Sequence, residues 1–289
     1  MPHCTLAGRG VIAVTGDDAE HLLHNVLTAD IEALPEGVAR ACALMSPQGK
    51  VLFDFLVGRD GAGFVIDIRS DAADDFLKRM MLYKLRSKAE FAKQDESVVA
   101  VSWDGESAMP DDEATLTLAD SRFPPDKVRR HVLPAGTALP EPAPVAAWDA
   151  LRIAHGVAES PHDFPPGEAF GHDIGFDHNG GIDFAKGCFV GQEVVSRMQH
   201  RGTARRRVVI VSAGADLPPT GTEIVAGGKP AGTLGTVVGR HGLAIVRLDR
   251  IGKARARGET IAAGEVALDF DLPPGVRYGW PETAATDDA

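Results

Sequence analysis

The sequence has 289 residues and a formal net charge of −11, from 30 Lys and Arg against 41 Asp and Glu, with 44% hydrophobic and 25% charged residues. This composition is that of an ordinary globular protein, and it argues against a general nucleic-acid-binding protein, which usually carries a basic domain. No stretch approaches the roughly 20 apolar residues that a membrane span needs. We therefore expect neither a membrane partner nor strong direct binding to nucleic acid.

The N-terminus and the cysteine count indicate the compartment. The first residues, MPHCTLAGRGVIAVTG, lack the basic segment and long apolar core of a secretory signal, and they are not rich in Arg and Ser as a transit peptide is. Three cysteines, Cys4, Cys42 and Cys188, cannot build a disulfide framework and suit a reducing compartment. These features predict a cytoplasmic protein.

The first hundred residues read as strands separated by two helices. The apolar spacing predicts a helix over about 18–28 and a second helix after Ser70 or Asp71. The buried stripe expected on the second helix consists of Phe76, Leu77, Met80, Met81 and Leu85. Strands are predicted over 11–16, 41–45, 51–57, 64–69 and 98–103, the second and third forming a hairpin. This order indicates an α+β fold and not a doubly wound parallel sheet.

The second half changes character at a Pro-rich connector over 134–144. A helix is predicted over 146–156, closed by Gly156. From about residue 204 short β-rich runs alternate with Gly-containing turns, which predicts a small antiparallel barrel or sandwich. The expected organisation is a first region over 1–203, a C-terminal β-barrel over 204–280 and an acidic tail over 281–289.

The segment KGCFVGQE, residues 186–193, is the strongest candidate for chemistry. Glycines on both sides of Cys188 permit backbone angles that a Cβ would forbid and let a ligand approach the main chain. Lys186 and a helix starting near Gln192 would both favour a thiolate at Cys188. A thiolate is what a nucleophile or a soft-metal ligand requires. The alternative from residue type alone is a buried, apolar cysteine.

This segment, together with LRIAHG, PPGE and RMQHRGTARRR, resembles the YgfZ family of folate-binding proteins related to tRNA modification. The mitochondrial counterpart of that family assists iron–sulfur cluster assembly, and the family is built like the aminomethyltransferase, or T-protein, of the glycine cleavage system. The similarity extends upstream through VIAVTGDDAEHLLHNVLTADI and LYKLRSKAEF, so it covers most of residues 8–210.

The resemblance implies an aminomethyltransferase-like α+β fold, with ferredoxin-like subdomains around a central hole that holds tetrahydrofolate or a derivative, and a C-terminal β-barrel. It implies a folate-binding accessory factor that assembles or maintains iron–sulfur clusters of client enzymes, such as radical-type tRNA methylthiotransferases, without classical turnover of its own. Iron–sulfur client or assembly proteins would be its partners.

The same resemblance suggests the site residues. Cys188, Lys186 and Glu193 are the candidates for chemistry, and Cys188 is also a possible ligand of a transient or shared cluster, because three cysteines cannot supply the usual four thiolates. The candidates for contact with folate, which needs an acceptor, a flat surface and nearby cations, are Asp54, Arg86, Trp148, Arg152, Glu168, Gln192 and Arg197.

Two alternatives remain open at this point. A folate-dependent aminomethyltransferase or demethylase-type enzyme is disfavoured by three departures from the aminomethyltransferases: one Asp, Asp54, where they carry a pair, Ala154 where they tend to carry Glu, and a Cys at position 188. In the segment 171–183, the His and Asp side chains are metal-ligand types, although their spacing fits no closed site.

Overall fold

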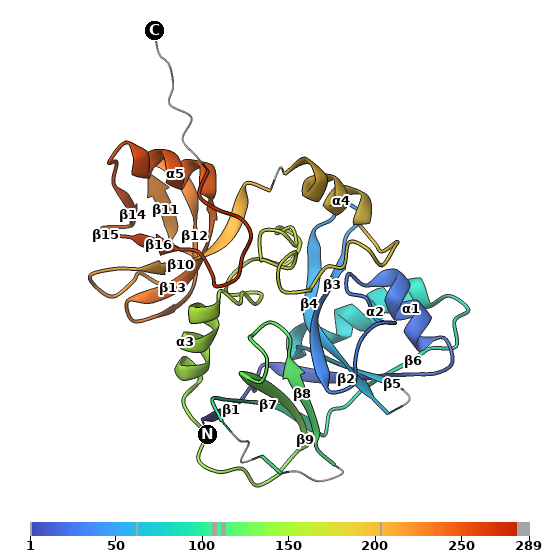
Figure 1. The fold of residues 1–289 in the computed structure, drawn as a ribbon. Helices are drawn as coiled ribbons and strands as arrows, with labels where there is room; N and C mark the ends of the chain where they lie inside the picture. Colours follow the sequence, from blue (N-terminus) through green and yellow to red (C-terminus); the bar gives the residue numbers. More distant parts are fainter. Residues whose placement is uncertain (1, 62, 106–108, 111–113, 203, 282–289) are drawn as a thin grey trace. The chain divides into compact units, whose positions relative to one another are not determined.

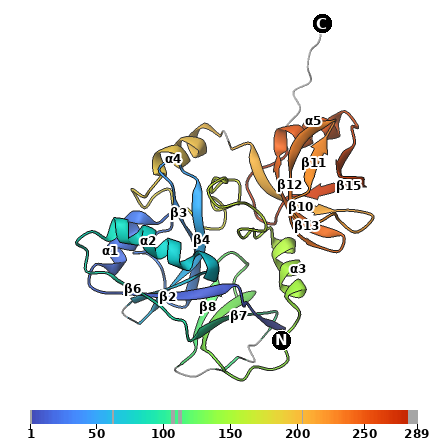
Figure 2. The same cartoon turned by 180° about the vertical axis from the view of Figure 1, so that it is seen from behind.

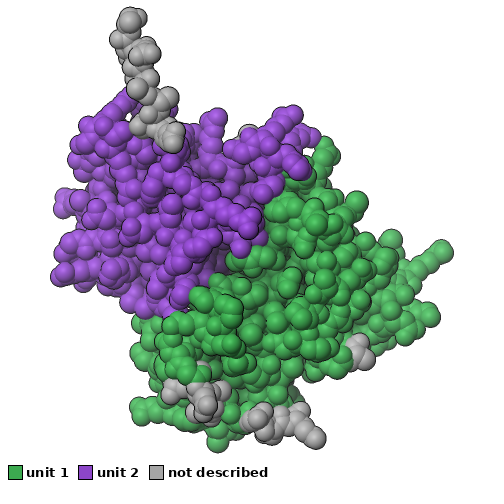
Figure 3. Space-filling view, in the orientation of Figure 1, with its two compact units in different colours: residues 1–148, 179–196 green, residues 149–178, 197–289 purple. Residues whose placement is uncertain are grey.

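The computed structural model describes residues 2–61, 63–105, 109–110, 114–202 and 204–281 (Figure 1). The chain forms two compact units, coloured separately in Figure 3. The first unit contains Met1–Trp148 and Asn179–Ser196, and the second contains Asp149–His178 and Arg197–Ala289. The predicted acidic tail lies, apart from Pro281, outside the described residues.

A nine-stranded sheet forms the framework of the first unit, in the order β1-β7-β9-β8-β3-β4-β5-β2-β6. All of its strand pairs are antiparallel except β3 with β8. The α+β prediction is therefore confirmed, and the predicted hairpin is the pair β3–β4. The strands are β1 His3–Thr5, β2 Arg9–Thr15, β3 Val38–Met45, β4 Val51–Asp60, β5 Gly63–Arg69, β6 Glu90–Lys93, β7 Ser97–Trp103, β8 Leu116–Asp120 and β9 Val128–Pro134.

Two helices, α1 (Ala19–Val26) and α2 (Ala73–Lys84), lie side by side in the first unit (Figures 1 and 2), with the short 3₁₀ helix η1 (Ser70–Ala72) leading into α2. Their apolar faces share one core, to which α2 contributes Phe76 and Met80. The predicted stripe on α2 is wrong at Met81 and Leu85, which are exposed. Tyr83 packs against the core instead, because it follows Met80 at i+3, and the helix ends before Leu85.

The second unit contains a seven-stranded antiparallel sheet in the order β15-β14-β11-β12-β13-β10-β16. The predicted helix over 146–156 is α3 (Val145–His155), and Gly156 closes it with φ +68°. The helix α5 (Leu248–Ala256) was not predicted. The remaining elements are α4 Gln192–Arg201, β10 Arg206–Ser212, β11 Glu223–Ala226, β12 Lys229–Val238, β13 His241–Arg247, β14 Ile261–Ala263, β15 Val266–Ala267 and β16 Asp269–Asp271. In the described part of the chain, no helix has the length and apolar character needed to cross a bilayer.

His131, fully buried in β9, makes the stability of the first unit dependent on pH. Its Nε2 lies 2.8 Å from Ser102 Oγ and its Nδ1 2.9 Å from Thr117 Oγ1. Burial, helped by the charge of Arg129, lowers the pKa of His131 to about 4. In the unfolded chain this histidine binds a proton near pH 6.5, whereas in the folded chain it stays neutral down to about pH 4. The contribution of His131 to the free energy of unfolding is therefore fully present above pH 6.5 and is lost as the pH falls towards 4.

The expected loss over that interval is about 3 kcal/mol at most. Urea unfolding of the wild type and of His131→Gln, followed from pH 7 to pH 4, measures it. The glutamine variant starts less stable but is expected to show a flatter decline. Parallel declines in the two proteins would contradict this role of His131.

Candidate functional site

The loop that carries Cys188 is shaped by two glycines. Gly187 has φ +101° and Gly191 has φ +84°, a region that residues with a Cβ rarely adopt. A Cβ on Gly191 would also lie 2.5 Å from the carbonyl oxygen of Ser46, so glycine alone allows the loop to approach the β3–β4 turn so closely. The predicted need for glycine on both sides of Cys188 is confirmed.

Cys188 is exposed, whereas Cys4 and Cys42 are buried. The next two residues explain how this exposure is maintained, because Phe189 is buried and Val190 packs against the core that α1 and α2 share. The loop is thus fixed by apolar side chains on one side and presents its thiol to solvent on the other. The alternative of a buried, apolar cysteine is wrong.

The chain before the loop is tied to the segment that follows α1. Thr28 Oγ1 donates to the carbonyl oxygen of Gly181 at 2.6 Å, and the amide of Asp183 donates to the carbonyl oxygen of Thr28 at 2.9 Å. Beyond the cysteine, the amide of Val190 donates to the carbonyl oxygen of Val26 at 3.5 Å. Hydrogen bonds on both sides of Cys188 therefore hold its loop against the end of α1.

Lys186 contributes to this anchoring through its ammonium group. Nζ donates to the carbonyl oxygens of His24, of Leu27 at 2.5 Å and of Ala29 at 2.9 Å. These carbonyls stand at or just beyond the C-terminus of α1, where oxygens lack helical partners and a cation is favourable. Burial lowers the pKa of Lys186 and raises the pKa of the Cys42 thiol. The predicted effect of Lys186 on a Cys188 thiolate stays a prediction.

The helix predicted after the loop is α4, which begins at Gln192. Gln192 Nε2 donates to the carbonyl oxygen of Gly187 at 2.6 Å and so closes the loop. Glu193 is exposed in the first turn of α4, where a carboxylate stabilises the helix N-terminus. Arg197 is exposed further along α4.

The other residues predicted to contact folate differ in exposure, since some are buried and others are exposed to solvent. Trp148 is buried, with its ring 5.5 Å from that of Phe123 and 5.4 Å from the guanidinium of Arg130. Arg152 is buried and donates to Asp163 at 2.9 Å. Their burial weighs against ligand contact, and their folate role stays a prediction. Asp54 is buried in β4, Arg86 is exposed beyond α2, and Glu168 is exposed before β10.

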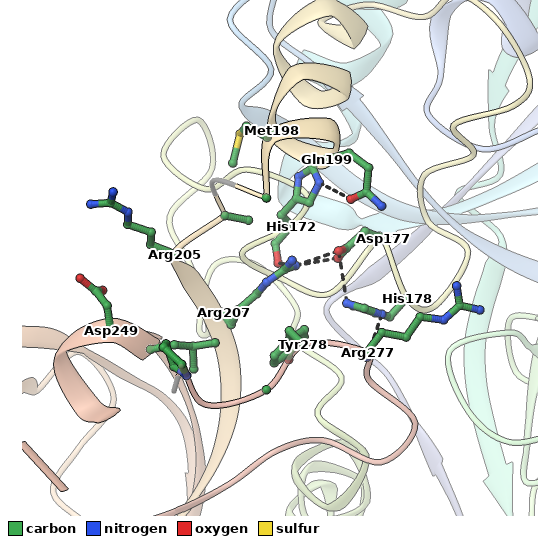
Figure 4. A pocket seen from close by; sticks show the side chains of 15 residues that line it. His172, Asp177, His178, Met198, Gln199, Arg205, Arg207, Asp249, Arg277 and Tyr278 are labelled. Atoms are coloured by element: carbon green, nitrogen blue, oxygen red, sulfur yellow. Dashed lines mark hydrogen bonds and ion pairs between the residues drawn. The ribbon is translucent and has the colours of Figure 1, made fainter. Parts of the chain in front are cut away.

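A cavity of about 520 Å³ lies within the second unit, lined by residues of 172–178, 198–207, 248–249 and 277–281 (Figure 4). Arg207 is its central cation. Nη1 of Arg207 donates to both carboxylate oxygens of Asp177 at 2.9 Å, and the guanidinium stands 4.6 Å from the centre of the Tyr278 ring. The Nε of Arg207 is buried and has no hydrogen-bond partner among the described residues.

The charges of this cavity favour an anionic ligand. Burial alone would raise the pKa of Asp177, but His178, whose Nε2 lies 3.2 Å from Asp177 Oδ2, and the charge of Arg207 outweigh it and hold that pKa below its usual value. Asp177 is therefore ionised and pairs with Arg207. Arg205 and Arg277 also line the cavity and are exposed, so the arginines outnumber the carboxylates that line it.

None of the residues predicted to bind folate lines this cavity. Two sequence segments line the cavity: RMQHRGTARRR, residues 197–207, which contains five arginines and no acidic residue, and the His- and Asp-containing segment 171–183. What one sequence does not reveal is that folding brings these two segments together. The alternative of a metal site in 171–183 is not supported, because no group of three or more His, Cys, Asp or Glu side chains within the described ranges is placed to hold a metal ion.

Comparison with known proteins gives a family and a fold. The model of the CAF17 C-terminal β-barrel domain matches residues 205–278. The mitochondrial iron–sulfur cluster assembly factor IBA57 homologue of Pyricularia oryzae is 30% identical over 305 residues, covering 93% of this chain and 78% of the relative. The homologue of Mycosarcoma maydis is 32% identical over 232 residues, covering 73% of this chain but only 56% of that relative.

Two further similarities agree with these. The human mitochondrial assembly factor IBA57 is 27% identical over 297 residues, covering 93% of this chain and 83% of the human protein. The crystal structure of the glycine cleavage system aminomethyltransferase T from Bartonella henselae superposes with a TM-score of 0.72, covering 95% of this chain and 86% of that chain at 15% identity. The predicted aminomethyltransferase-like fold with a C-terminal β-barrel is confirmed.

The relatives make one prediction coarser and contradict another. They are named IBA57 and not YgfZ, so they support the predicted role in iron–sulfur cluster assembly, and the predicted link to tRNA modification stays a prediction. They are also named mitochondrial, which contradicts the predicted cytoplasmic location. The physical reason for that error is that few cysteines and no disulfide framework indicate a reducing environment, which does not distinguish one reducing compartment from another.

Proposed function

Because the chain belongs to the IBA57 family of iron–sulfur cluster assembly factors, we propose that it takes part in the assembly or maintenance of iron–sulfur clusters and acts through the sulfur of Cys188. The cluster is the cargo that the protein handles. The observation that carries this proposal is the exposure of one thiol on an anchored loop, while Cys4 and Cys42 are buried.

A cluster needs more ligands than this loop supplies. Iron–sulfur clusters are held by thiolates, typically four. Within the ranges that the structure describes, no further cysteine is exposed and no set of three metal-ligating side chains comes together. We infer that Cys188 provides one ligand and that a partner, either a client enzyme or another assembly protein, provides the others.

Cells that lack the wild-type copy test this function. Cys188→Ala is expected to lower the activity of a cluster-dependent client, such as a radical-type tRNA methylthiotransferase, by at least about tenfold, because a metal ligand is removed. Cys4→Ala is the matched control, since it makes the same change at a buried thiol. Full client activity with Cys188→Ala would remove the cysteine from the mechanism.

We also propose that the cavity of the second unit binds a folate, with the carboxylates of its glutamate end near the arginines. A volume of about 520 Å³ lies within the roughly 300–1,000 Å³ of small-molecule sites. Guanidinium groups suit carboxylates in charge and geometry. The free Nε–H of Arg207, counted against the described residues, gives such a ligand a buried donor.

The exposed arginines of the cavity provide the test. The double variant Arg205→Gln, Arg277→Gln is expected to weaken tetrahydrofolate binding by roughly tenfold or more, because two charge-assisted contacts are lost. Arg201→Gln is the control, since Arg201 belongs to the same basic run but does not line the cavity. Isothermal titration calorimetry measures the affinities. Equal affinity in all three proteins would place folate elsewhere.

A further inference from the structure

Three large apolar side chains are exposed at the C-terminal end of α2. Met81, Leu82 and Leu85 have exposed fractions of 45%, 65% and 85%. Met81 and Leu82 are consecutive in the last turn of α2, and Leu85 follows in the turn that ends the helix, so the three side chains gather at this end of α2. We call these three residues the α2 patch. Scattered single apolar residues on a surface are ordinary, but a contiguous group indicates an interaction site.

The backbone at Leu85 is strained and receives no compensation from burial. The amide of Ser87 donates to the carbonyl oxygen of Lys84 at 2.8 Å, which closes a four-residue turn with Leu85 in its second position. Leu85 has φ +46° and ψ −106° there, angles close to those of a type II′ turn, in which glycine dominates this position. Burial of the side chain does not offset this strain, and such outliers concentrate at functional sites.

Three cations without ion-pair partners among the described residues are close in sequence to the patch, on α2 or just after it. Arg79, Lys84 and Arg86 form no ion pair with any residue in the described ranges, whereas their neighbour Lys78 pairs with Asp75 at 2.7 Å. The whole chain has a net charge of −11. Protein interfaces usually have an apolar centre and a polar or charged rim. Apolar side chains with basic neighbours, on a protein that is otherwise acidic, would complement a partner whose surface is acidic around an apolar centre.

The α2 patch is held rigidly relative to the cysteine loop. Met80 and Tyr83 of α2 and Val190 of the loop belong to one hydrophobic core. The helices α1 and α2 of this core lie side by side in both views of the first unit (Figures 1 and 2). A partner that binds the patch therefore has a fixed position relative to the Cys188 loop.

We propose that the α2 patch, with Arg79, Lys84 and Arg86, is the docking surface for an acidic protein that exchanges a cluster with the Cys188 loop. This inference rests on the proposed function. It favours a protein over an anionic membrane, because the net charge of −11 opposes approach to an anionic bilayer. The proposed partner is not a second copy of this chain, because within the described residues a second copy would add only one more exposed thiol, whereas a cluster typically needs four thiolates.

The double variant Leu82→Asp, Leu85→Asp tests the docking surface in cells that lack the wild-type copy. We expect client activity to fall by about tenfold or more, as for the loss of central contacts at an interface, with no fall in the unfolding temperature of the purified protein. Val145→Asp is the matched control, because Val145 is 54% exposed and lies on α3. The triple variant Arg79→Glu, Lys84→Glu, Arg86→Glu is expected to show the same loss.

Cys188→Ala in the same assay separates the two proposals. If Cys188→Ala abolishes client activity and both patch variants retain it, the docking surface is overturned and the proposed function stands. If Cys188→Ala also retains full activity, the proposed function fails and the docking surface, which depends on it, fails too. Equal losses in the patch variants and in Val145→Asp would likewise overturn the docking surface.

Leu85→Gly gives a second test that does not depend on an introduced charge. Glycine relieves the positive φ, so the unfolding midpoint is expected to rise by roughly 2–4 °C while client activity falls. If Leu85→Gly is more stable and fully active, and the patch variants also keep full client activity, the proposal is overturned.

Two further measurements on the 289-residue chain test the other possible occupants of the α2 patch. Sedimentation with vesicles of phosphatidylcholine and phosphatidylserine tests a membrane, and sedimentation velocity tests a second copy. Vesicle binding that Leu82→Asp, Leu85→Asp abolishes would overturn the proposal in favour of a membrane. A dimer that the same variant dissociates would overturn it in favour of self-association.

Discussion

Purified Cys188→Ala protein is expected to bind at least about tenfold less iron–sulfur cluster than the wild type. The assay is anaerobic reconstitution with iron, sulfide and an excess of glutathione, a small thiol that supplies the ligands a partner would provide. The reason for the large effect is that Cys188 offers the one exposed cysteine sulfur in the described chain. Bound iron and sulfide, determined after gel filtration, measure the result.

Two variants make this result specific. Cys4→Ala makes the same change at a buried thiol and is expected to bind as much cluster as the wild type. Cys188→Ser keeps the size of the side chain but replaces a soft ligand with a harder one, so weaker binding is expected. Cluster binding by Cys188→Ala at the level of Cys4→Ala would show that another group holds the iron.

Lys186→Met is expected to lower the free energy of unfolding by about 2 kcal/mol, because a charged donor is removed from partly buried carbonyl oxygens. The ammonium donates to the carbonyl oxygens of His24, Leu27 and Ala29, and methionine keeps the apolar stem but no donor. The same hydrogen bonds position the residues just before Cys188. We therefore expect faster amide hydrogen exchange at Phe189 and Val190 in the variant.

Urea unfolding measures the stability loss, and Lys78→Met is its control. Lys78 is exposed and pairs with Asp75 on the same helix, a kind of ion pair that contributes little. A Lys186→Met protein as stable as Lys78→Met would mean that the carbonyl oxygens find other partners, and the anchoring of the cysteine loop would need another explanation.

The structural features that depend on residues close together in the sequence could be predicted. The hairpin β3–β4 and the helices α1 and α3 are predictable because the apolar and turn residues that specify them lie within a few positions of one another. The glycine requirement around Cys188 was predictable for the same reason, since Gly187 and Gly191 have positive φ. The family resemblance added the aminomethyltransferase-like fold, which spacing alone does not specify.

The rest depends on contacts between distant parts of the chain. In the sequence, Lys186 is a neighbour of Cys188, yet its ammonium donates to carbonyl oxygens more than 150 residues away in the chain. The cavity of the second unit joins Asp177, Arg207 and Tyr278, and no periodicity relates these residues. The exposure of Leu85 follows from the end of α2 one residue earlier, and helix ends are the least predictable part of an element.

The most direct test of the account is alkylation of Cys188 with iodoacetamide, followed by mass spectrometry of all three cysteine peptides. In the cluster-free protein we predict rapid modification of Cys188 and none of Cys4 or Cys42. After reconstitution with a cluster and glutathione, we predict that Cys188 is protected. Modification of Cys188 at the same rate with and without the cluster would contradict the claim that its sulfur holds the cargo.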